Sequence, residues 1–382
     1  MIIASMASML DNFNRNNISI LEEMGFDISL AANFKDEDSN SLEKNRLFYK
    51  EMKSNGYNVF HVDFSRSISN IPKQIKSIIQ VNKLLKNNYD IVHCNSPICS
   101  VITRIAYRKY RKKNGGKLLY TAHGFHFYDG APKKNWFIYY PIEKYCSRFT
   151  DVLITINNED YLRAKEKFHA QNTVYIHGIG IDTKKFNSFF SDTEKKRKEL
   201  GISSNDIMLL SVGELSARKN QSVVIKALPI LNDTRIHYFI AGIGKMQLEY
   251  LELAKKLGVE NHVHLLGYRN DISELCQCSD LYVFPSLQEG LPVALMEAIS
   301  CKVPVVCSNI RGNTDLIEEK TCLFNPNSKE SVSLCIRKRI NGLNRNDIRC
   351  NFNNIINKNH KRLMQFSNES VNNEMKRIYY SL

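Results

Sequence analysis

The chain has 382 residues, of which 43% are hydrophobic and 24% charged, and its formal net charge is +14 at pH 7. This composition is typical of a globular protein, and the length suffices for two domains of ordinary size. The sequence holds no run of about 18 apolar residues, which excludes a transmembrane helix, and its first residues lack the basic start and long apolar core of a signal peptide. We therefore expect a cytoplasmic protein.

Short apolar segments alternate with helix-like segments through the first half of the chain. Such alternation favours parallel strands joined by crossover helices, and so a doubly wound α/β domain over residues 1–182. The expected strands are Ile2–Ala4, Asp27–Ala31, Asn58–Val62, Asp90–Cys94, Lys117–Ala122, Val152–Ile156 and Thr173–His177. The expected helices are Asn12–Met24, Ser41–Lys53, Ile75–Leu85, Val101–Lys112, Trp136–Phe149 and Glu159–Phe168.

A charged and polar stretch, residues 183–206, follows as a predicted linker, and a second α/β series covers residues 207–360. Its expected strands are Ile207–Val212, His237–Ile240, Val263–Leu266, Leu281–Phe284 and Val303–Cys307. Its expected helices are Ser222–Leu231, Lys245–Leu257, Asp271–Cys276 and Pro292–Ile299. Residues 361–382 are either a polar tail or a helix that packs back on the first domain. Two domains of this kind bind ligands at the carboxyl ends of their strands, so we expect the site in the cleft between them.

Seven basic residues occur between Arg104 and Lys117 without an acidic one. Such a patch attracts phosphate-rich partners, either an anionic membrane leaflet or nucleic acid, and the alternative is a solvated helix face. Nucleic acid explains only the charge, because no recognised nucleic-acid-binding module is present. We therefore predict no nucleic-acid partner.

Three loops that follow strands of the second series carry candidate ligand-binding residues. Arg218 and Lys219 follow the first strand and are suited to hold a pyrophosphate, the arginine in bidentate fashion and the lysine as a point charge. Gly242 and Gly244 form a Gly-x-Gly turn, which permits close approach of a nucleotide but is weak evidence alone. The segment Gly267–Asp271 follows the third strand and is placed to present backbone groups to a base edge.

Two carboxylates, Glu289 and Glu297, are separated by eight positions around Gly290 and Pro292. Pro292 suits the first turn of a helix, so Glu297 is expected inside the helix and Glu289 on the loop before it. A loop carboxylate and a helix carboxylate can converge on a polyhydroxy ligand, while the helix N-terminus favours a phosphate. The alternative interpretation is two solvated surface charges.

In the first domain, His123 and His126 follow a strand among aromatic residues, and His93 and Asn95 lie at another strand end. Imidazoles and aromatic rings suit sugar binding, although histidines in such places are often structural groups. Asp36-Glu37-Asp38 has the spacing of a manganese-binding motif, but its polar surroundings predict solvated carboxylates. We therefore predict no metal site.

Taken together, these segments resemble bacterial glycosyltransferases of the large retaining family 4, and within it the enzymes that build capsule and exopolysaccharide. Their fold is GT-B, two facing Rossmann-like domains. The resemblance covers nearly the whole chain and rests on TAHGFHFY (121–128), SVGELSARKN (211–220), AGIG (241–244), LLGYRNDI (265–272) and VFPSLQEGLPVALMEA (283–298).

The resemblance implies a role for each candidate residue. His123 contacts the transferred sugar, Arg218 and Lys219 neutralise the leaving diphosphate, and Glu289 faces the donor sugar, so these four are the expected catalytic residues. Glu297 binds the ribose. The other expected donor-binding residues are Gly213, Gly242, Gly244, Tyr268, Arg269, Gly290 and Leu291, and the expected acceptor-binding residues are His93, Asn95 and His126.

The resemblance also implies a nucleotide sugar as donor, with UDP the expected nucleotide, no cofactor or bound metal, and a polyprenyl-diphosphate-linked saccharide as acceptor. The stretch from Arg104 to Lys117 would then hold the enzyme at the inner membrane leaflet. Two alternatives stay open, a non-catalytic GT-B subunit and a GT-B nucleotide-sugar epimerase. Many relatives carry a Gly-Gly pair after the first strand, whereas this chain has Ser5–Asp11 there, and the donor sugar, acceptor and linkage are open.

Overall fold

The computed structural model describes residues 1–35, 42–65, 70–186, 190, 192–340 and 345–382. The chain folds as two compact units, one formed by Met1–Ile179 with Glu369–Leu382 and the other by Gly180–Asn368. The predicted linker 183–206 lies in the second unit and contains helices α8 (Thr183–Phe186) and α9 (Thr193–Glu199). The predicted Asp36-Glu37-Asp38 loop lies outside the described residues.

The first unit is built on a seven-stranded parallel sheet in the order β3-β2-β1-β4-β5-β6-β7. Buried strands run along its centre, where β1, β4 and β5 pair through residues such as Ile3, Cys94 and Tyr120. The strands are β1 (Ile2–Met6), β2 (Ser29–Asn33), β3 (Asn58–His61), β4 (Ile91–Asn95), β5 (Lys117–Ala122), β6 (Val152–Thr155) and β7 (Asn172–Tyr175).

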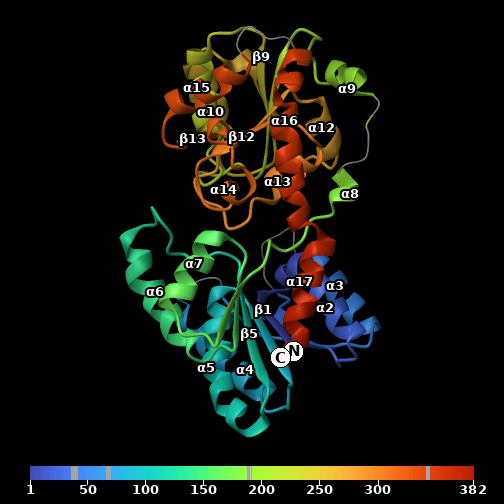
Figure 1. The fold of residues 1–382 in the computed structure, drawn as a ribbon, viewed down its shortest axis with the longest axis vertical. Helices are drawn as coiled ribbons and strands as arrows, with labels where there is room; N and C mark the ends of the chain where they lie inside the picture. The colour runs from blue at the N-terminus through green and yellow to red at the C-terminus, as the bar shows by residue number, and fades with distance from the viewer. Residues whose placement is uncertain (36–41, 66–69, 187–189, 191, 341–344) are drawn as a thin grey trace. The chain divides into compact units, whose positions relative to one another are not determined.

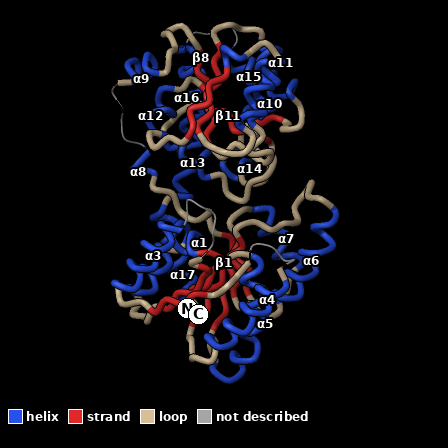
Figure 2. Tube along the Cα trace, turned by 180° about the vertical axis from the view of Figure 1, so that it is seen from behind, coloured by secondary structure: helices blue, strands red, loops and turns tan. Residues whose placement is uncertain are grey.

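Helices cover both faces of this sheet. Figures 1 and 2 show α4, α5 and α6 on one face and α2, α3 and α17 on the other. The helices are α1 (Ala7–Phe13), α2 (Arg15–Glu23), α3 (Leu42–Ser54), α4 (Ile71–Leu84), α5 (Pro97–Asn114), α6 (Lys133–Ser147), α7 (Asn158–Lys167) and α17 (Asn368–Tyr380). The last of these returns from the end of the chain to the first sheet, where Tyr379 is buried and bonded to His93.

The second unit is built on a six-stranded parallel sheet in the order β10-β9-β8-β11-β12-β13. Its strands are β8 (Ile207–Val212), β9 (Ile236–Ala241), β10 (Val263–Gly267), β11 (Leu281–Phe284), β12 (Val305–Ser308) and β13 (Leu323–Phe324). Its further helices are α10 (Gln221–Leu231), α11 (Gln247–Lys256), α12 (Ile272–Cys278), α13 (Val293–Ser300), α14 (Asn313–Leu316), α15 (Lys329–Ile340) and α16 (Arg345–Leu363), with 3-10 turns at Glu260–His262, Lys320–Cys322 and Met364–Phe366. The centre of its core is β8 and β11, where all four residues of β11 are buried.

The predicted fold class is confirmed: both units are doubly wound parallel α/β domains. The predicted helix Asn12–Met24 is wrong in its extent, because two helices occupy Ala7 to Glu23. The buried Asn14 separates them, with a non-helical backbone and an amide that donates to the carbonyl of Met9 at 3.0 Å. Helix α4 begins at Ile71 rather than Ile75, since Pro72 fits its first turn and the side chain of Asn70 caps it. The short strand β13 was not predicted.

No helix in the described part of the chain combines the length and the apolar character that a membrane crossing requires.

Candidate active site

The carboxyl ends of β8 and β11 bring three predicted residues together. These strands are neighbours in the second sheet, so the loops that leave them lie side by side. The backbone N–H of Leu287 donates to the carbonyl of Arg218 at 2.9 Å and joins the two loops. Lys219 Nζ then lies 2.7 Å from Glu289 Oε1, and an Arg218 guanidinium nitrogen lies 3.1 Å from the same oxygen.

This cluster of Arg218, Lys219 and Glu289 has one carboxylate between two cations and therefore an excess positive charge. The side chains of Glu289 and Lys219 are only 7% and 13% exposed, whereas that of Arg218 is 46% exposed. Lys219 also lies over the ring of Phe284, with its nitrogen 5.0 Å from the ring centre. A shielded cation beside a more open arginine is suited to bind a ligand with several negative charges.

Glu297 lies on α13, as the sequence predicts. It forms no hydrogen bond or ion pair with the described side chains of this cluster. Among the described residues, its carboxyl group has neither a hydrogen bond nor an ion pair. Burial raises the pKa of Glu297 from 4.5 to about 7, and the charge of Lys185 on α8 lowers it only in part. Near neutral pH the group therefore divides between a carboxylate and a carboxylic acid, and it is open to a hydroxyl partner.

The predicted glycines join three loops to one another. Gly213 N–H donates to Ala241 at 2.9 Å, and Gly242 N–H donates to Gly267 at 2.8 Å. A Cβ on Gly242 would lie 2.0 Å from the carbonyl oxygen of Gly213, and one on Gly244 would lie 2.3 Å from that of Leu215. Glycine is therefore required here by contact between loops, a reason different from the predicted approach of a ligand.

Tyr268 and Arg269 follow β10. Tyr268 is 68% exposed, while the guanidinium of Arg269 is bonded to Asp271, which also accepts from Lys196 at 2.7 Å. Gly290 and Leu291 lie half-buried between Glu289 and the start of α13. The donor-binding roles of these four residues stay predictions. For Arg269 to bind a donor, its guanidinium must break its bond to Asp271 or contact the donor and Asp271 together.

In the first unit, the ends of β4 and β5 bring His123 and Asn95 together. His123 Nε2 lies 3.0 Å from Asn95 Oδ1, and the Phe13 ring packs 5.4 Å from the imidazole. Burial lowers the pKa of His123 to about 4, so its ring is neutral at physiological pH. The amide nitrogen of the 1% exposed Asn95 has no hydrogen-bond partner in the described part of the chain. Both side chains line one small pocket and leave hydrogen-bonding capacity there.

His93 and His126, the other predicted acceptor residues, are placed differently. His93 has no exposed surface, and its nitrogens lie 2.8 Å from the Tyr379 hydroxyl and 2.7 Å from that of Thr121. Its burial leaves it no surface to contact an acceptor, so it supports the pocket from behind. His126 stacks on Tyr139 of α6 with ring centres 4.5 Å apart and is not among the residues that line the pocket.

The pocket also has walls that the sequence analysis missed. They come from α1 and α2 and from the C-terminal helix α17, and the residues are Phe13, Asn16, Asn17, Val371, Asn372 and Met375. The oxygen of the Asn372 amide is buried without a partner among the described residues. In the sequence these segments differ from others only by their many asparagines. That composition is equally typical of a polar tail, so it did not predict a pocket wall.

The predicted basic patch from Arg104 to Lys117 is not one surface. Arg104 is completely buried and bonded to Glu143 at 2.6 Å, and Arg111 is bonded to Asp151. Arg108 and Lys109 are exposed, Lys117 is half-buried, and the side chains of Lys112 and Lys113 lie outside the described residues. The prediction was wrong for Arg104, because a buried carboxylate on α6 pairs with it.

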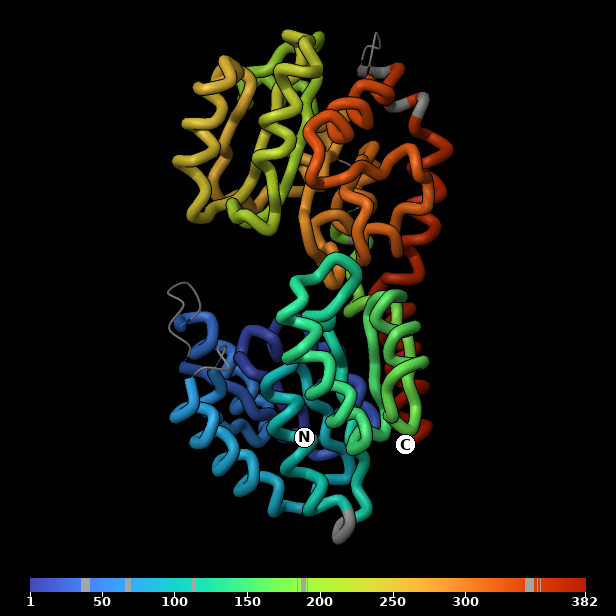
Figure 3. Tube along the Cα trace, turned by 90° about the vertical axis from the view of Figure 1, so that its left-hand side faces the viewer, coloured from blue at the N-terminus to red at the C-terminus, as the bar shows by residue number. Residues whose placement is uncertain are grey.

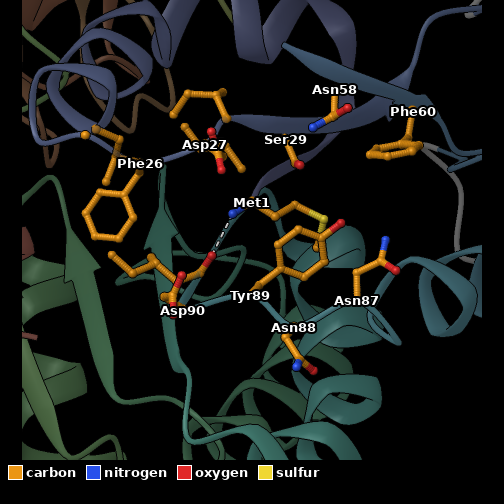
Figure 4. Close-up of a pocket in the computed structure, with 15 residues that line it drawn as sticks. Met1, Phe26, Asp27, Ser29, Asn58, Phe60, Asn87, Asn88, Tyr89 and Asp90 are labelled. Atoms are coloured by element: carbon orange, nitrogen blue, oxygen red, sulfur yellow. Dashed lines mark hydrogen bonds between the residues drawn. The ribbon is translucent and has the colours of Figure 1, made fainter.

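A larger cavity of about 450 Å³ opens at the amino ends of β1 to β4 (Figure 4). It is lined by Phe26, Asn58 and Tyr89 among others, and the amino group of Met1 donates to the carbonyl of Ile91 there at 2.6 Å. The candidate residues lie at the carboxyl ends of strands, so this cavity is at the other edge of the sheet from His123 and Asn95.

Comparison with known families matches both units. Residues 18–185 match the model described as Glycosyltransferase Family 4, and residues 192–351 match that of Glycosyl transferases group 1. The chain is 37% identical to the putative glycosyltransferase EpsD of Bacillus subtilis (strain 168), over 78% of this chain and 75% of that one. It is 32% identical to the Escherichia coli UDP-Gal:alpha-D-GlcNAc-diphosphoundecaprenol alpha-1,3-galactosyltransferase, over 67% of each chain.

Solved structures share the fold. Anabaena HepE in complex with UDP and glucose matches with a TM-score of 0.74 and 20% identity, over 100% of this chain and 99% of that one. WaaG, a glycosyltransferase involved in lipopolysaccharide biosynthesis, matches with a TM-score of 0.70 and 17% identity, over 99% of each chain.

Proposed function

The chain belongs to the family 4 glycosyltransferases, and from that premise we propose that it transfers a hexose or N-acetylhexosamine from a UDP-sugar to a saccharide on polyprenyl diphosphate. The transfer would retain the anomeric configuration and serve the synthesis of capsule or exopolysaccharide. The cluster of Arg218, Lys219 and Glu289 is the observation that carries the proposal.

The cluster suits departure of a nucleoside diphosphate. When the bond between the anomeric carbon and the phosphate oxygen breaks, negative charge grows on that oxygen, and Arg218 and Lys219 stabilise it. Both cations contact Glu289 at 3.1 and 2.7 Å, so they are already oriented before a donor binds. Glu289 holds these cations and faces the donor sugar; it is not the catalytic base.

Glu297 is suited to bind the ribose of the donor. A carboxyl group without a hydrogen-bond partner in the described structure can accept from two neighbouring hydroxyls. Such bonds favour the carboxylate and offset the burial that raises its pKa to about 7. Donor binding is therefore expected to be coupled to proton release from Glu297.

Neutral His123 and Asn95 are suited to bind sugar hydroxyls. A neutral imidazole donates at one nitrogen and accepts at the other, and the amide nitrogen of Asn95 is a donor without a partner among the described residues. The acceptor hydroxyl attacks the anomeric carbon and its proton passes to the departing phosphate oxygen, so retention needs no side-chain base. No metal or cofactor enters this proposal.

The nature of the acceptor is supported by the named relatives. The Escherichia coli relative is named for a diphosphoundecaprenol acceptor, and a Campylobacter jejuni relative at 26% identity is named for N,N'-diacetylbacillosaminyl-diphospho-undecaprenol. A lipid-linked acceptor would require the enzyme to work at the inner face of the cell membrane.

Donor binding is tested first by the shift of the unfolding temperature with UDP-, GDP- and ADP-sugars. A ligand that binds only the folded protein raises the unfolding temperature by mass action, and we expect the rise with a UDP-sugar. A rise with GDP- or ADP-sugars alone would overturn the choice of nucleotide.

Transfer is then measured with the selected donor and synthetic undecaprenyl-diphosphate-linked saccharides, and the anomeric coupling of the product is read by NMR. Arg218→Ala should lower kcat by about 10²-fold or more. Arg235→Ala is the matched control, because Arg235 forms a partly exposed pair with Asp233 in the same unit. Equal losses in both variants would contradict the role of Arg218.

A further inference from the structure

Helix α4 in the first unit exposes its apolar stripe. Ile71, Ile75, Ile78 and Ile79 follow helical spacing and are 63%, 54%, 43% and 65% exposed, while the buried side of the helix contributes Ser77 and Val81. An amphipathic helix of a globular domain ordinarily buries such a stripe. This helix therefore presents an apolar face without a partner in the described structure.

The neighbouring helix α6 extends the same surface. Phe137, Ile138, Ile142 and Tyr145 are 81%, 47%, 37% and 49% exposed. Helix α5 lies between α4 and α6, and the three run side by side in Figure 3. A groove of about 190 Å³ connects the helices and is lined mainly by apolar side chains, namely Ile78, Pro97, Ile98, Val101, Tyr139 and Ile142. We call these exposed residues and the groove the isoleucine face.

The charged residues of helices α4, α5 and α6 are almost all basic. They carry twelve lysine and arginine residues and one carboxylate, Glu143. That carboxylate is 4% exposed and bonded to Arg104, so the helices expose no substantial negative charge to balance Lys73, Lys83 or Lys133. Lys76 is bonded to Asp63, which follows β3. An apolar face with a cationic rim results.

The partner of such a face must be apolar and anionic. A second copy of the chain would place two cationic rims against each other, which like-charge repulsion opposes. The surface of an anionic bilayer supplies hydrocarbon for the isoleucines and phosphate groups for the lysines.

We propose that the isoleucine face docks on an anionic lipid bilayer and that its groove takes up a hydrocarbon chain. The proposal rests on the proposed lipid-linked acceptor, and it replaces the basic run from Arg104 to Lys117 with α4 and α6 as the main membrane contact. Arg108 and Lys109 of α5 belong to the rim, whereas Arg104 and Arg111 are engaged inside the protein.

The single tryptophan of the sequence, Trp136, lies on α6 beside Phe137, and its partly buried ring packs on Phe127 and Tyr140. Its quenching therefore reports the approach of a bilayer to α6. The protein is mixed with vesicles of phosphatidylcholine and phosphatidylglycerol in equal parts, with brominated acyl chains, and quenching of Trp136 is followed together with cosedimentation. We expect binding, quenching and a strong decrease of both at high salt. Vesicles of phosphatidylcholine alone should bind much more weakly.

The double variant Ile75→Gln/Ile79→Gln should lower the partition to anionic vesicles on the order of tenfold, because two side chains lose apolar contact. Leu47→Gln is the matched control: Leu47 is 60% exposed on α3, which covers the other face of the sheet, and its replacement should leave the partition unchanged. Both changes are at exposed positions, so the fold should tolerate them.

Equal binding of the double variant Ile75→Gln/Ile79→Gln and the wild type would overturn the proposal. Self-association through this face, or absence of vesicle binding, would overturn it as well. Thermal shift with UDP-sugars in the absence of vesicles is measured on the same preparations. A chain that binds donors but not vesicles contradicts the docking surface only, whereas one that binds vesicles but no donor contradicts the proposed function.

Discussion

Replacing Glu297 by glutamine should stabilise the second unit at alkaline pH. The pKa of Glu297 is about 7 in the folded protein against 4.5 as its ordinary value, so the folded state holds the proton more tightly than the unfolded chain. The contribution of Glu297 to the free energy of unfolding is therefore most favourable below pH 4.5 and falls as the pH rises to about 7. The difference corresponds to about 3 kcal/mol at pH 8. Glutamine stays neutral and avoids this loss.

The assay is thermal and urea unfolding of wild type and Glu297→Gln between pH 4.5 and 8. The stabilities should agree near pH 4.5 and diverge with rising pH, and 3 kcal/mol corresponds to roughly 6 to 12 °C in a domain of this size. Glu252→Gln, at an exposed position on α11, is the control. Parallel pH profiles of Glu297→Gln and wild type would refute the reasoning.

The same variant should bind the UDP-sugar more weakly, because it loses the carboxylate proposed to accept hydrogen bonds from the ribose. Stability and donor affinity should therefore change in opposite directions.

Further predictions concern the cluster, the loops and the buried pairs. Lys219→Gln should lower kcat by about 10²-fold, because it removes the cation that contacts Glu289 at 2.7 Å; unchanged turnover would remove Lys219 from the mechanism. Gly244→Ala should destabilise the second unit by roughly 2 kcal/mol or more in urea unfolding, because its Cβ would meet a backbone carbonyl at 2.3 Å, whereas Gly258→Ala, with open space around it, should cost about 1 kcal/mol. Arg104→Met should cost about 3 to 5 kcal/mol by leaving Glu143 buried without its cation, and the double variant with Glu143→Leu should recover part of it; an additive loss would contradict the pairing. Tyr379→Phe should cost about 1 to 2 kcal/mol, since His93 loses a buried hydrogen bond, and an unchanged unfolding midpoint would show that this bond contributes nothing.

The sequence alone was sufficient for every strand except the short β13, and for the candidate residues that follow β8 and β11. Alternation of apolar and amphipathic segments identifies parallel strands, and candidate residues directly after β8 and β11 must lie at one edge of one sheet. For that reason Lys219 and Glu289 could be expected to meet, although seventy positions separate them, and the structure brings them to 2.7 Å. The raised pKa of Glu297 could not be predicted in the same way. It results from burial of the carboxyl group, and helical spacing does not show how deeply a side chain is buried.

Side chains within one helix show what the sequence pattern lacks. Arg104, Arg108 and Arg111 of α5 are spaced as one helical face, and the sequence interpretation placed them together on a surface. In the structure Arg104 is buried against Glu143 and Tyr120, Arg108 is exposed above Phe149, and Arg111 is bonded to Asp151. Each partner is supplied by a segment outside the helix, between 16 and 41 positions away along the chain in the printed sequence. Helix α4 gives the converse case, since its isoleucines have the spacing of a core face and yet lie at the surface. Helical periodicity therefore identifies which residues share a face, but the neighbouring elements decide whether that face is covered, and a face left uncovered is evidence about binding partners rather than about the fold.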